Sequence, residues 1–102
     1  MSESRGYSRA LLKISGEAFA GQRGYGLDPG KTGWIAQQIA QARENGCQLG
    51  VVVGGGNIMR GVDAASIGVP PLVGDQMGMI ATILNALALR SALDSCSVAA
   101  RI

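Results

Sequence analysis

Two glycine-rich turns contain the residues of this sequence that are best suited to bind phosphate. Gly16 follows the apolar run of residues 10–15, and three consecutive glycines at 54–56 follow the β-rich run of residues 47–53. Glycine lets backbone N–H groups approach an anion closely, and a concave set of such donors suits phosphate oxygens. The alternative is that each cluster is only a tight turn. Phosphate binding is the better hypothesis if both turns meet at one edge of a sheet.

Lys13 is the first candidate for a positive charge at such a site. It stands between Leu12 and Ile14, and burying an unpaired ammonium group in an apolar strand is costly, so an anion is expected beside it. Its flexible side chain could reach the edge where the glycines lie. The alternative is a lysine on an edge strand that extends into water. Arg60, four residues beyond Gly56, is a second candidate, although a single arginine in a loop is more often simply solvated.

Two established phosphate motifs do not match. Met59 stands where the dinucleotide pattern G-x-G-x-x-G requires its last glycine. Residues 30–32 (GKT) resemble the end of a P-loop, but Tyr25 occupies the position of the earlier glycine and no strand precedes the motif. These mismatches disfavour a Rossmann dehydrogenase and a P-loop nucleotide hydrolase.

Two predicted strands bring the glycine turns together. Residues 10–15 and 47–53 are short apolar or β-rich runs that each end in glycine, which predicts buried strands. With a helix between them they form a βαβ unit, whose strands are parallel and whose crossover is right-handed. Loops at the carboxyl ends of parallel strands share one edge, where open α/β proteins bind ligands. The sequence therefore predicts an α/β fold with Gly16 and residues 54–56 as neighbours.

The helix between these strands has clear predicted ends. Asp28 is the expected N-cap, Pro29 suits the first helical position, and Gly46 follows the last turn, so the helix spans about residues 29–45. Before it, residues 16–27 contain four glycines and no apolar period, which predicts a long loop.

The remaining residues predict a long apolar helix and a third strand. Residues 57–71 show no clear period and should be irregular, with at most one helical turn. Residues 74–93 are apolar on nearly every side, which predicts a helix buried by the sheet and by another subunit; a membrane span is less favoured because polar residues interrupt the run. Asp75 is either the N-cap of this helix or a carboxylate that binds a ribose. Residues 96–102 predict the third strand.

Composition limits the classes of function. The 102 residues are 47% hydrophobic and 16% charged, with a net charge of +2, which fits one small globular domain and gives no basic surface for nucleic acid or an anionic membrane. The absence of histidine excludes Ser-His hydrolysis and histidine-zinc chemistry within this chain. Cys47 and Cys96 form no C-x-x-C pair and are expected to be reduced thiols. The polar opening is unlike a secretory signal and favours the cytoplasm.

Three segments resemble bacterial UMP kinases, a family of the amino-acid-kinase superfamily: LLKISGEAFAG, VVVGGGNIMRG and VGDQMGMIATILNALALR. They occur in the family's order and spacing, and the third separates UMP kinases from carbamate, acetylglutamate and aspartate kinases. The resemblance implies a three-layer αβα sandwich with a mostly parallel sheet, of which residues 1–102 are the amino-terminal part of one domain. It also implies transfer of the ATP γ-phosphoryl group to UMP with Mg²⁺, and a cytoplasmic homohexamer that GTP activates.

The resemblance also assigns roles to individual residues. Lys13 matches the catalytic lysine that stabilises the transferring phosphoryl group. The implied ATP-binding residues are Lys13, Ile14, Ser15, Gly16, Gly56 and Arg60. The implied UMP-binding residues are Gly55 and Asp75. The implied GTP-effector residues are Gly21, Gln22, Arg23, Gly24, Tyr25, Gly26, Arg90 and Arg101. Ser91 and Asp94 stand where some members have acidic and histidine side chains, so control by GTP remains open.

Two alternatives remain beside UMP phosphorylation. Another amino-acid-kinase member acting on a carboxylate or carbamate would share Lys13 and the glycine turns but should lack the ribose-binding Asp75. A chain that only binds nucleotide or associates with itself is the second alternative, because the family's segments for the uracil, the adenine and a second catalytic acid lie beyond Ile102.

Overall fold

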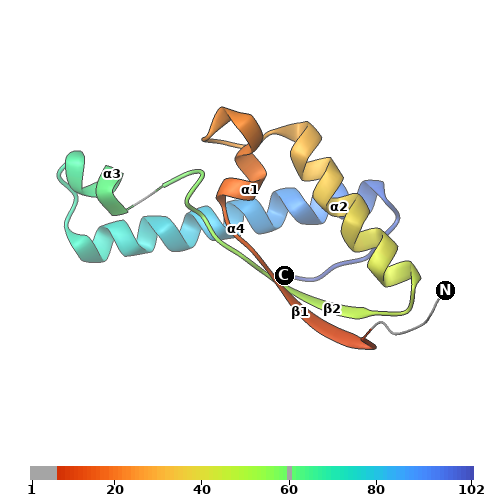
Figure 1. Ribbon diagram of the computed structural model, residues 1–102. Helices are drawn as coiled ribbons and strands as arrows, with labels where there is room; N and C mark the ends of the chain where they lie inside the picture. Colours follow the sequence, from red (N-terminus) through yellow and green to blue (C-terminus); the bar gives the residue numbers. More distant parts are fainter. Residues whose placement is uncertain (1–6, 60) are drawn as a thin grey trace.

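The structure is a computed structural model that describes residues 7–59 and 61–102. A parallel pair of strands forms its base (Figure 1). Strand β1 (Arg9–Ile14) pairs with β2 (Gln48–Val53), with Arg9 opposite Gln48 and Ile14 opposite Val53. Helix α2 (Pro29–Glu44) connects them, so the predicted βαβ unit and the α/β class are confirmed (Figure 1).

Helix α2 begins and ends where the sequence predicts. The Asp28 carboxylate accepts a hydrogen bond from the Gly30 N–H at 3.0 Å, and Pro29 occupies the first helical position, where its missing N–H costs nothing. The chain leaves the helix through Gly46, whose φ of +89° is a left-handed conformation that favours glycine.

The helices cover one face of the sheet. Ile14 is buried in a core cluster with residues of α2 and of the long helix α4 (Pro71–Ser95), and Val51 and Val53 pack against this cluster. Leu11 and Lys13 of β1 lie on the opposite face, which is exposed in the described residues. These residues therefore supply the sheet and one helical layer of the expected sandwich.

Residues 16–27 are more ordered than the predicted loop. They contain the one-turn helix α1 (Glu17–Ala20) and the 3₁₀ turn η1 (Gly21–Arg23). Phe19 is fully buried in the core, and burial of this large side chain fixes the chain as a helical turn directly after Gly16. Glycine content alone could not indicate this because the anchoring residue is a single aromatic.

Helix α4 starts earlier than predicted and leaves Asp75 inside it. Pro70 is the N-cap residue, and Pro71 is well suited to the first turn. Asp75 is therefore not the N-cap, and its exposed side chain lies in the second turn. Before α4, the short helix α3 (Gly61–Ser66) accounts for the single helical turn expected there, and it packs on α4.

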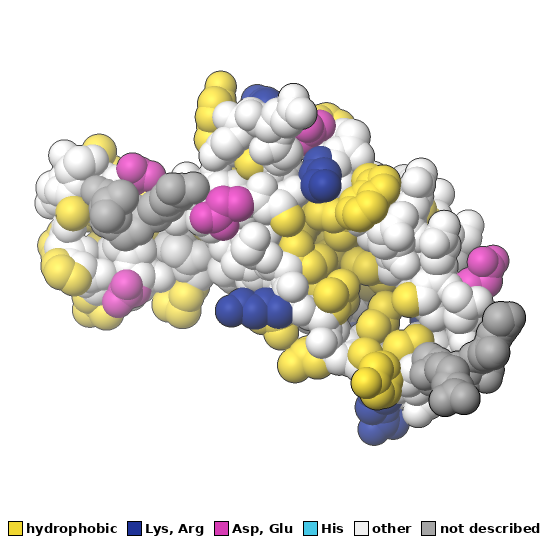
Figure 2. All heavy atoms as spheres, viewed as in Figure 1, with side chains coloured by type: hydrophobic (Ala, Val, Ile, Leu, Met, Phe, Trp, Pro, Cys, Tyr) yellow, Lys and Arg dark blue, Asp and Glu magenta, His cyan; other side chains and the backbone are white. Residues whose placement is uncertain are grey.

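One stripe of α4 is buried and the rest is exposed. The buried residues Ala81, Asn85, Leu89 and Leu93 recur every four positions and face the core. Ile80 and Ile83 on other sides are 65% and 52% exposed, so burial on most sides does not occur within the described chain. By length and composition alone α4 could cross a membrane, a test that core helices also pass. Figure 2 shows apolar side chains gathered between the sheet and the helices.

Residues 96–102 do not form the predicted third strand. The chain turns after α4, where the Val98 N–H donates to the Leu93 carbonyl at 3.0 Å and Ser97 has a φ of +61°. The residues that follow run back toward the sheet without joining its ladder, which in the described chain consists of β1 and β2 (Figure 1). An apolar sequence becomes a strand only where a neighbouring backbone accepts its hydrogen bonds.

Candidate active site

The two glycine turns touch at the carboxyl ends of the strands. The Gly54 N–H donates to the Ile14 carbonyl at 2.9 Å, which holds the start of the second turn on the end of β1. A Cβ atom on Gly16 would lie 2.5 Å from the Gly56 nitrogen, closer than any side chain permits. The predicted convergence of the turns is therefore confirmed. Their binding of phosphate stays a prediction.

Gly55 lies directly on helix α4. A Cβ atom at this position would stand 2.8 Å from the Ala81 Cβ and 3.1 Å from the Gly78 carbonyl oxygen. Glycine is thus required by packing, whether or not Gly55 also contacts UMP. Asp75 lies three residues before Gly78, on the same side of the helix and one turn away. Gly55 therefore packs on the helix that carries Asp75.

The structure supports the two candidates for a positive charge at the site, Lys13 and Arg60, less well than it supports the glycine turns. Lys13 lies on the open face of the sheet, opposite Val52, and its side chain is exposed. The premise that Lys13 is buried is therefore wrong for the described residues, and its exposure agrees with the alternative of a lysine that extends into water. Ser15 is also exposed, beside the buried Gly16. Arg60 lies outside the described residues.

Glu17 is a charged neighbour of the turns that motif reasoning missed. A Cβ atom on Gly56 would lie 3.1 Å from both carboxylate oxygens of Glu17, which opens α1. This carboxylate would oppose a bare phosphate but suits a phosphate carrying Mg²⁺, since Mg²⁺ is usually bound by one or two carboxylates together with substrate phosphates. Residues 7–59 and 61–102 contain no group of three side chains that could hold a metal by themselves. This donor set fits Mg²⁺ that arrives with ATP.

Two buried asparagines, also missed, join the turns to the rest of the fold. Asn57 follows the three glycines, and Asn85 interrupts the buried stripe of α4. Their side-chain amides form two reciprocal hydrogen bonds of 3.1 and 2.7 Å. The sequence contains one indication of this pair. Asn85 is a polar residue at a core position of an apolar helix, and such a residue requires a buried partner.

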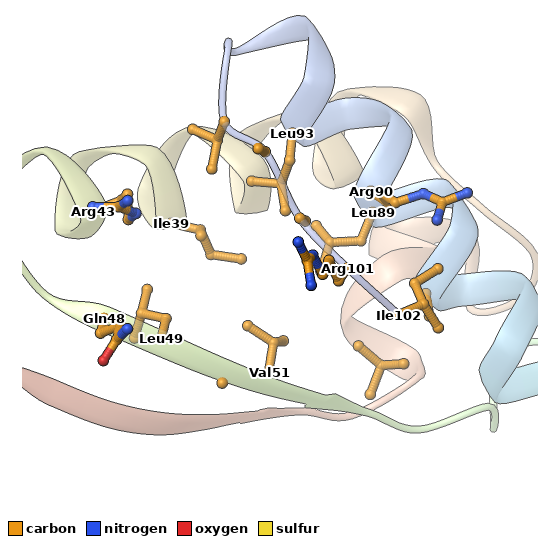
Figure 3. A pocket seen from close by; sticks show the side chains of 16 residues that line it. Ile39, Arg43, Gln48, Leu49, Val51, Leu89, Arg90, Leu93, Arg101 and Ile102 are labelled. Atoms are coloured by element: carbon orange, nitrogen blue, oxygen red, sulfur yellow. The ribbon is translucent and has the colours of Figure 1, made fainter.

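The implied effector residues fall into two separate places. Arg90 and Arg101 line a cavity of about 460 Å³ between β2, α2, α4 and the terminal segment, which Arg43 also lines (Figure 3). Residues 21–26 do not line this cavity. They form η1 and the following turn, with Gly24 and Gly26 at positive φ. Their role toward GTP stays a prediction.

Comparison with known protein families identifies the class of protein to which this chain belongs. A family model described as the amino acid kinase family matches residues 8–102, nearly the whole chain. The chain belongs to the amino acid kinase family, which agrees with the observed α/β fold.

Within this family, the chain is similar to individual uridylate kinases. The chain is 49% identical over 96 residues to the uridylate kinases of Phocaeicola vulgatus and Aliivibrio fischeri, covering 94% of this chain in each case. The crystal structure of UMP kinase from Bacillus anthracis superimposes on 89% of the chain with a TM-score of 0.82 and 38% identity. UMP kinase from Ureaplasma parvum superimposes on 88% with a TM-score of 0.81 and 37% identity. The resemblance seen in the three sequence segments is confirmed.

The similarity covers only part of each relative. The chain spans 41% and 40% of the length of the two curated uridylate kinases, and 37% and 39% of the two crystal structures.

Proposed function

We propose that the complete gene product containing this chain transfers the γ-phosphoryl group of ATP to UMP, giving UDP and ADP. The observation that carries the proposal is the contact between the two glycine turns, where Gly16 and Gly56 approach too closely for any side chain. This turn pair lies at the carboxyl edge of a parallel sheet, which is where phosphates bind in open α/β folds. The similarity to uridylate kinases supports UMP over a carboxylate or carbamate.

The reaction requires the protein mainly to position the two substrates and to supply positive charge to the phosphates. An oxygen of the UMP phosphate attacks the γ-phosphorus of ATP, the bond to the β,γ-bridging oxygen breaks, and ADP leaves. The attacking oxygen is already anionic, so no side chain must remove a proton, which suits a chain without histidine. Mg²⁺ bound to the ATP phosphates would neutralise part of their charge, and the Glu17 carboxylate beside Gly56 would lie next to it.

Each predicted site residue has a defined task in this proposal. Lys13 swings from the open face of β1 to the transferring phosphoryl group and stabilises the charge that develops on it. The ATP phosphates lie along residues 13–16 with Gly56 and Arg60, and UMP lies between Gly55 and Asp75. The exposed position of Lys13 supports this task because a solvated side chain is free to reorient toward a ligand.

The finer properties of the complete protein are also proposals. The exposed apolar sides of α4 support association into a homohexamer, since exposed apolar surface of this kind marks interfaces. Arg90 and Arg101, which share one cavity, are proposed to respond to GTP together with residues 21–26. A cytoplasmic location fits an enzyme that uses ATP and UMP.

A second candidate concerns residues 1–102 by themselves. Because they span about two fifths of their curated relatives, they could bind nucleotide or associate without catalysing transfer.

One experiment that compares acceptor substrates and the mass of the polypeptide tests both candidate functions. The intact mass of the purified polypeptide shows which length of chain is present, and ADP formation from ATP is then measured with UMP, carbamate or acetylglutamate as the acceptor. Turnover with UMP alone supports the proposal, and turnover with either of the other acceptors would contradict it. Nucleotide binding and self-association without turnover, in a polypeptide whose mass equals residues 1–102, would support the second candidate.

A further inference from the structure

Asn57 and Asn85 form a closed amide pair in the interior of the protein. Asn57 Nδ2 donates to Asn85 Oδ1 at 3.1 Å, and Asn85 Nδ2 donates to Asn57 Oδ1 at 2.7 Å. Both side chains are almost completely buried, with exposed fractions of 3% and 0%. Two buried amides that satisfy each other in this way are stable together, and each becomes costly if the other is removed.

The pair also holds two backbone segments. The second N–H of Asn57 Nδ2 donates to the Gly26 carbonyl at 2.8 Å, and that of Asn85 Nδ2 donates to the Gly54 carbonyl at 2.8 Å. The Gly26 N–H in turn donates to the Asn57 carbonyl at 2.8 Å. The glycine turn is therefore tied on one side to the turn after η1 and on the other side to helix α4.

The end of β1 fits against the same pair. A Cβ atom on Gly16 would lie 2.7 Å from Asn57 Oδ1, so the amide occupies the space that a side chain at position 16 would need. Asn57 lies in the segment that follows β2 and Asn85 lies in α4, so the pair joins this segment to the helix. Both glycine turns and α4 thus contact one rigid, fully hydrogen-bonded group.

We propose that Asn57 and Asn85 are positioning residues for phosphoryl transfer, which fix the glycine turn against the helix that carries Asp75. This inference rests on the proposed function. Asp75 lies ten residues before Asn85, or about 15 Å along the helix axis, so a small tilt at Asn85 displaces Asp75 relative to Gly55. A misplacement of about 1 Å between groups that hold the two substrates can lower the rate about a hundredfold.

The test uses Asn85→Leu in the complete gene product, with Gln38→Leu on the exposed side of α2 as the matched change from amide to leucine. At a temperature where circular dichroism shows both variants fully folded, Asn85→Leu should lower kcat about 10- to 100-fold and raise the KM for UMP. Gln38→Leu should change neither by more than about twofold. A purely structural role would scale kcat with the folded fraction and leave KM unchanged, and this result would overturn the proposal.

Hydrogen exchange supplies a readout that does not depend on catalysis. In Asn85→Leu the Gly26 amide should exchange about tenfold faster relative to the Asn45 amide, which bonds to the Gln41 carbonyl at the end of α2, away from the pair. Unchanged relative exchange would overturn the coupling. If Asn85→Leu does not fold, Asn85→Ser, which removes the pair but keeps a small polar group, is measured in the same two ways. Absence of UMP turnover in the unsubstituted protein would instead refute the proposed function, and the exchange result would still decide whether the pair holds the turn.

Discussion

Replacing Gly16 by alanine should force the two glycine turns apart. The new Cβ would lie 2.5 Å from the Gly56 nitrogen, which is about 0.9 Å inside the 3.4 Å at which ordinary van der Waals contact begins. It would also lie 2.9 Å from the Gly55 carbonyl carbon, so both clashes are with backbone that cannot rotate away. Overpacking of this kind costs about 1–3 kcal/mol. In a chain as long as the relatives, about 2 kcal/mol lowers the melting temperature by about 4–8 °C.

Gly56→Ala is the matched change at the other turn. The three atoms nearest to its Cβ would be those of the Glu17 carboxylate, at 3.1–3.3 Å, which belong to the end of a side chain and not to backbone. Stability should therefore change by less than about 1 kcal/mol. A methyl group at the proposed phosphate position should nevertheless weaken ATP binding by about tenfold or more, because backbone N–H groups bind an anion only at close approach.

Thermal melting and calorimetric titration with MgATP measure these two effects separately. Gly16→Ala should lose stability and ATP affinity together, whereas Gly56→Ala should lose affinity alone. A Gly16→Ala protein with the melting temperature of the unsubstituted chain would refute the contact between the turns. Unchanged ATP affinity in Gly56→Ala would refute phosphate binding at this edge.

Three further changes probe the same site. Lys13→Ala in the complete gene product should lower turnover about a hundredfold while leaving the melting temperature unchanged, since the side chain is exposed; near-normal turnover would remove its catalytic role. Gly55→Ala should destabilise the fold by about 1–3 kcal/mol through its clash with Ala81, and a normal urea midpoint would contradict that packing. Residues 1–102 alone should form no UDP and should self-associate through exposed apolar surface, so a monomer by light scattering that turns over roughly 1 to 100 times per second would contradict this expectation.

The part of the fold that the sequence predicts well is set by local chemistry. Asp28, Pro29 and Gly46 each act on the backbone next to them, so the ends of α2 follow from residue type alone. The convergence of Gly16 with residues 54–56 follows from one topological rule about parallel strands. Neither inference requires knowledge of which distant side chains meet.

The parts that were predicted wrongly depend on distant partners. Phe19 orders its helical turn by packing into a core built from α2 and α4, and residues 96–102 lack a strand because no neighbouring backbone in the described chain pairs with them. Lys13 sits on a face that the described residues leave open, so local apolar neighbours gave a false impression of burial. The amide pair joins residues 28 positions apart, and its partner could not be identified from spacing.

Positions 16, 55 and 56 are glycine for different physical reasons. These reasons decide whether glycine at each position is evidence for a bound ligand. Gly16 is required by the Gly56 nitrogen and Asn57, and Gly55 by the Ala81 Cβ and the adjoining backbone of α4, so both would be glycine in a protein that bound no ligand. Gly56 is different, because the atoms nearest to a new Cβ belong to the Glu17 carboxylate, at 3.1–3.3 Å, and not to backbone. Packing therefore requires glycine less strictly at position 56 than at positions 16 and 55, and close approach of an anion to the backbone is a second reason that the proposed function would supply. Substitution at Gly56 therefore separates phosphate binding from packing better than substitution at Gly16 or Gly55.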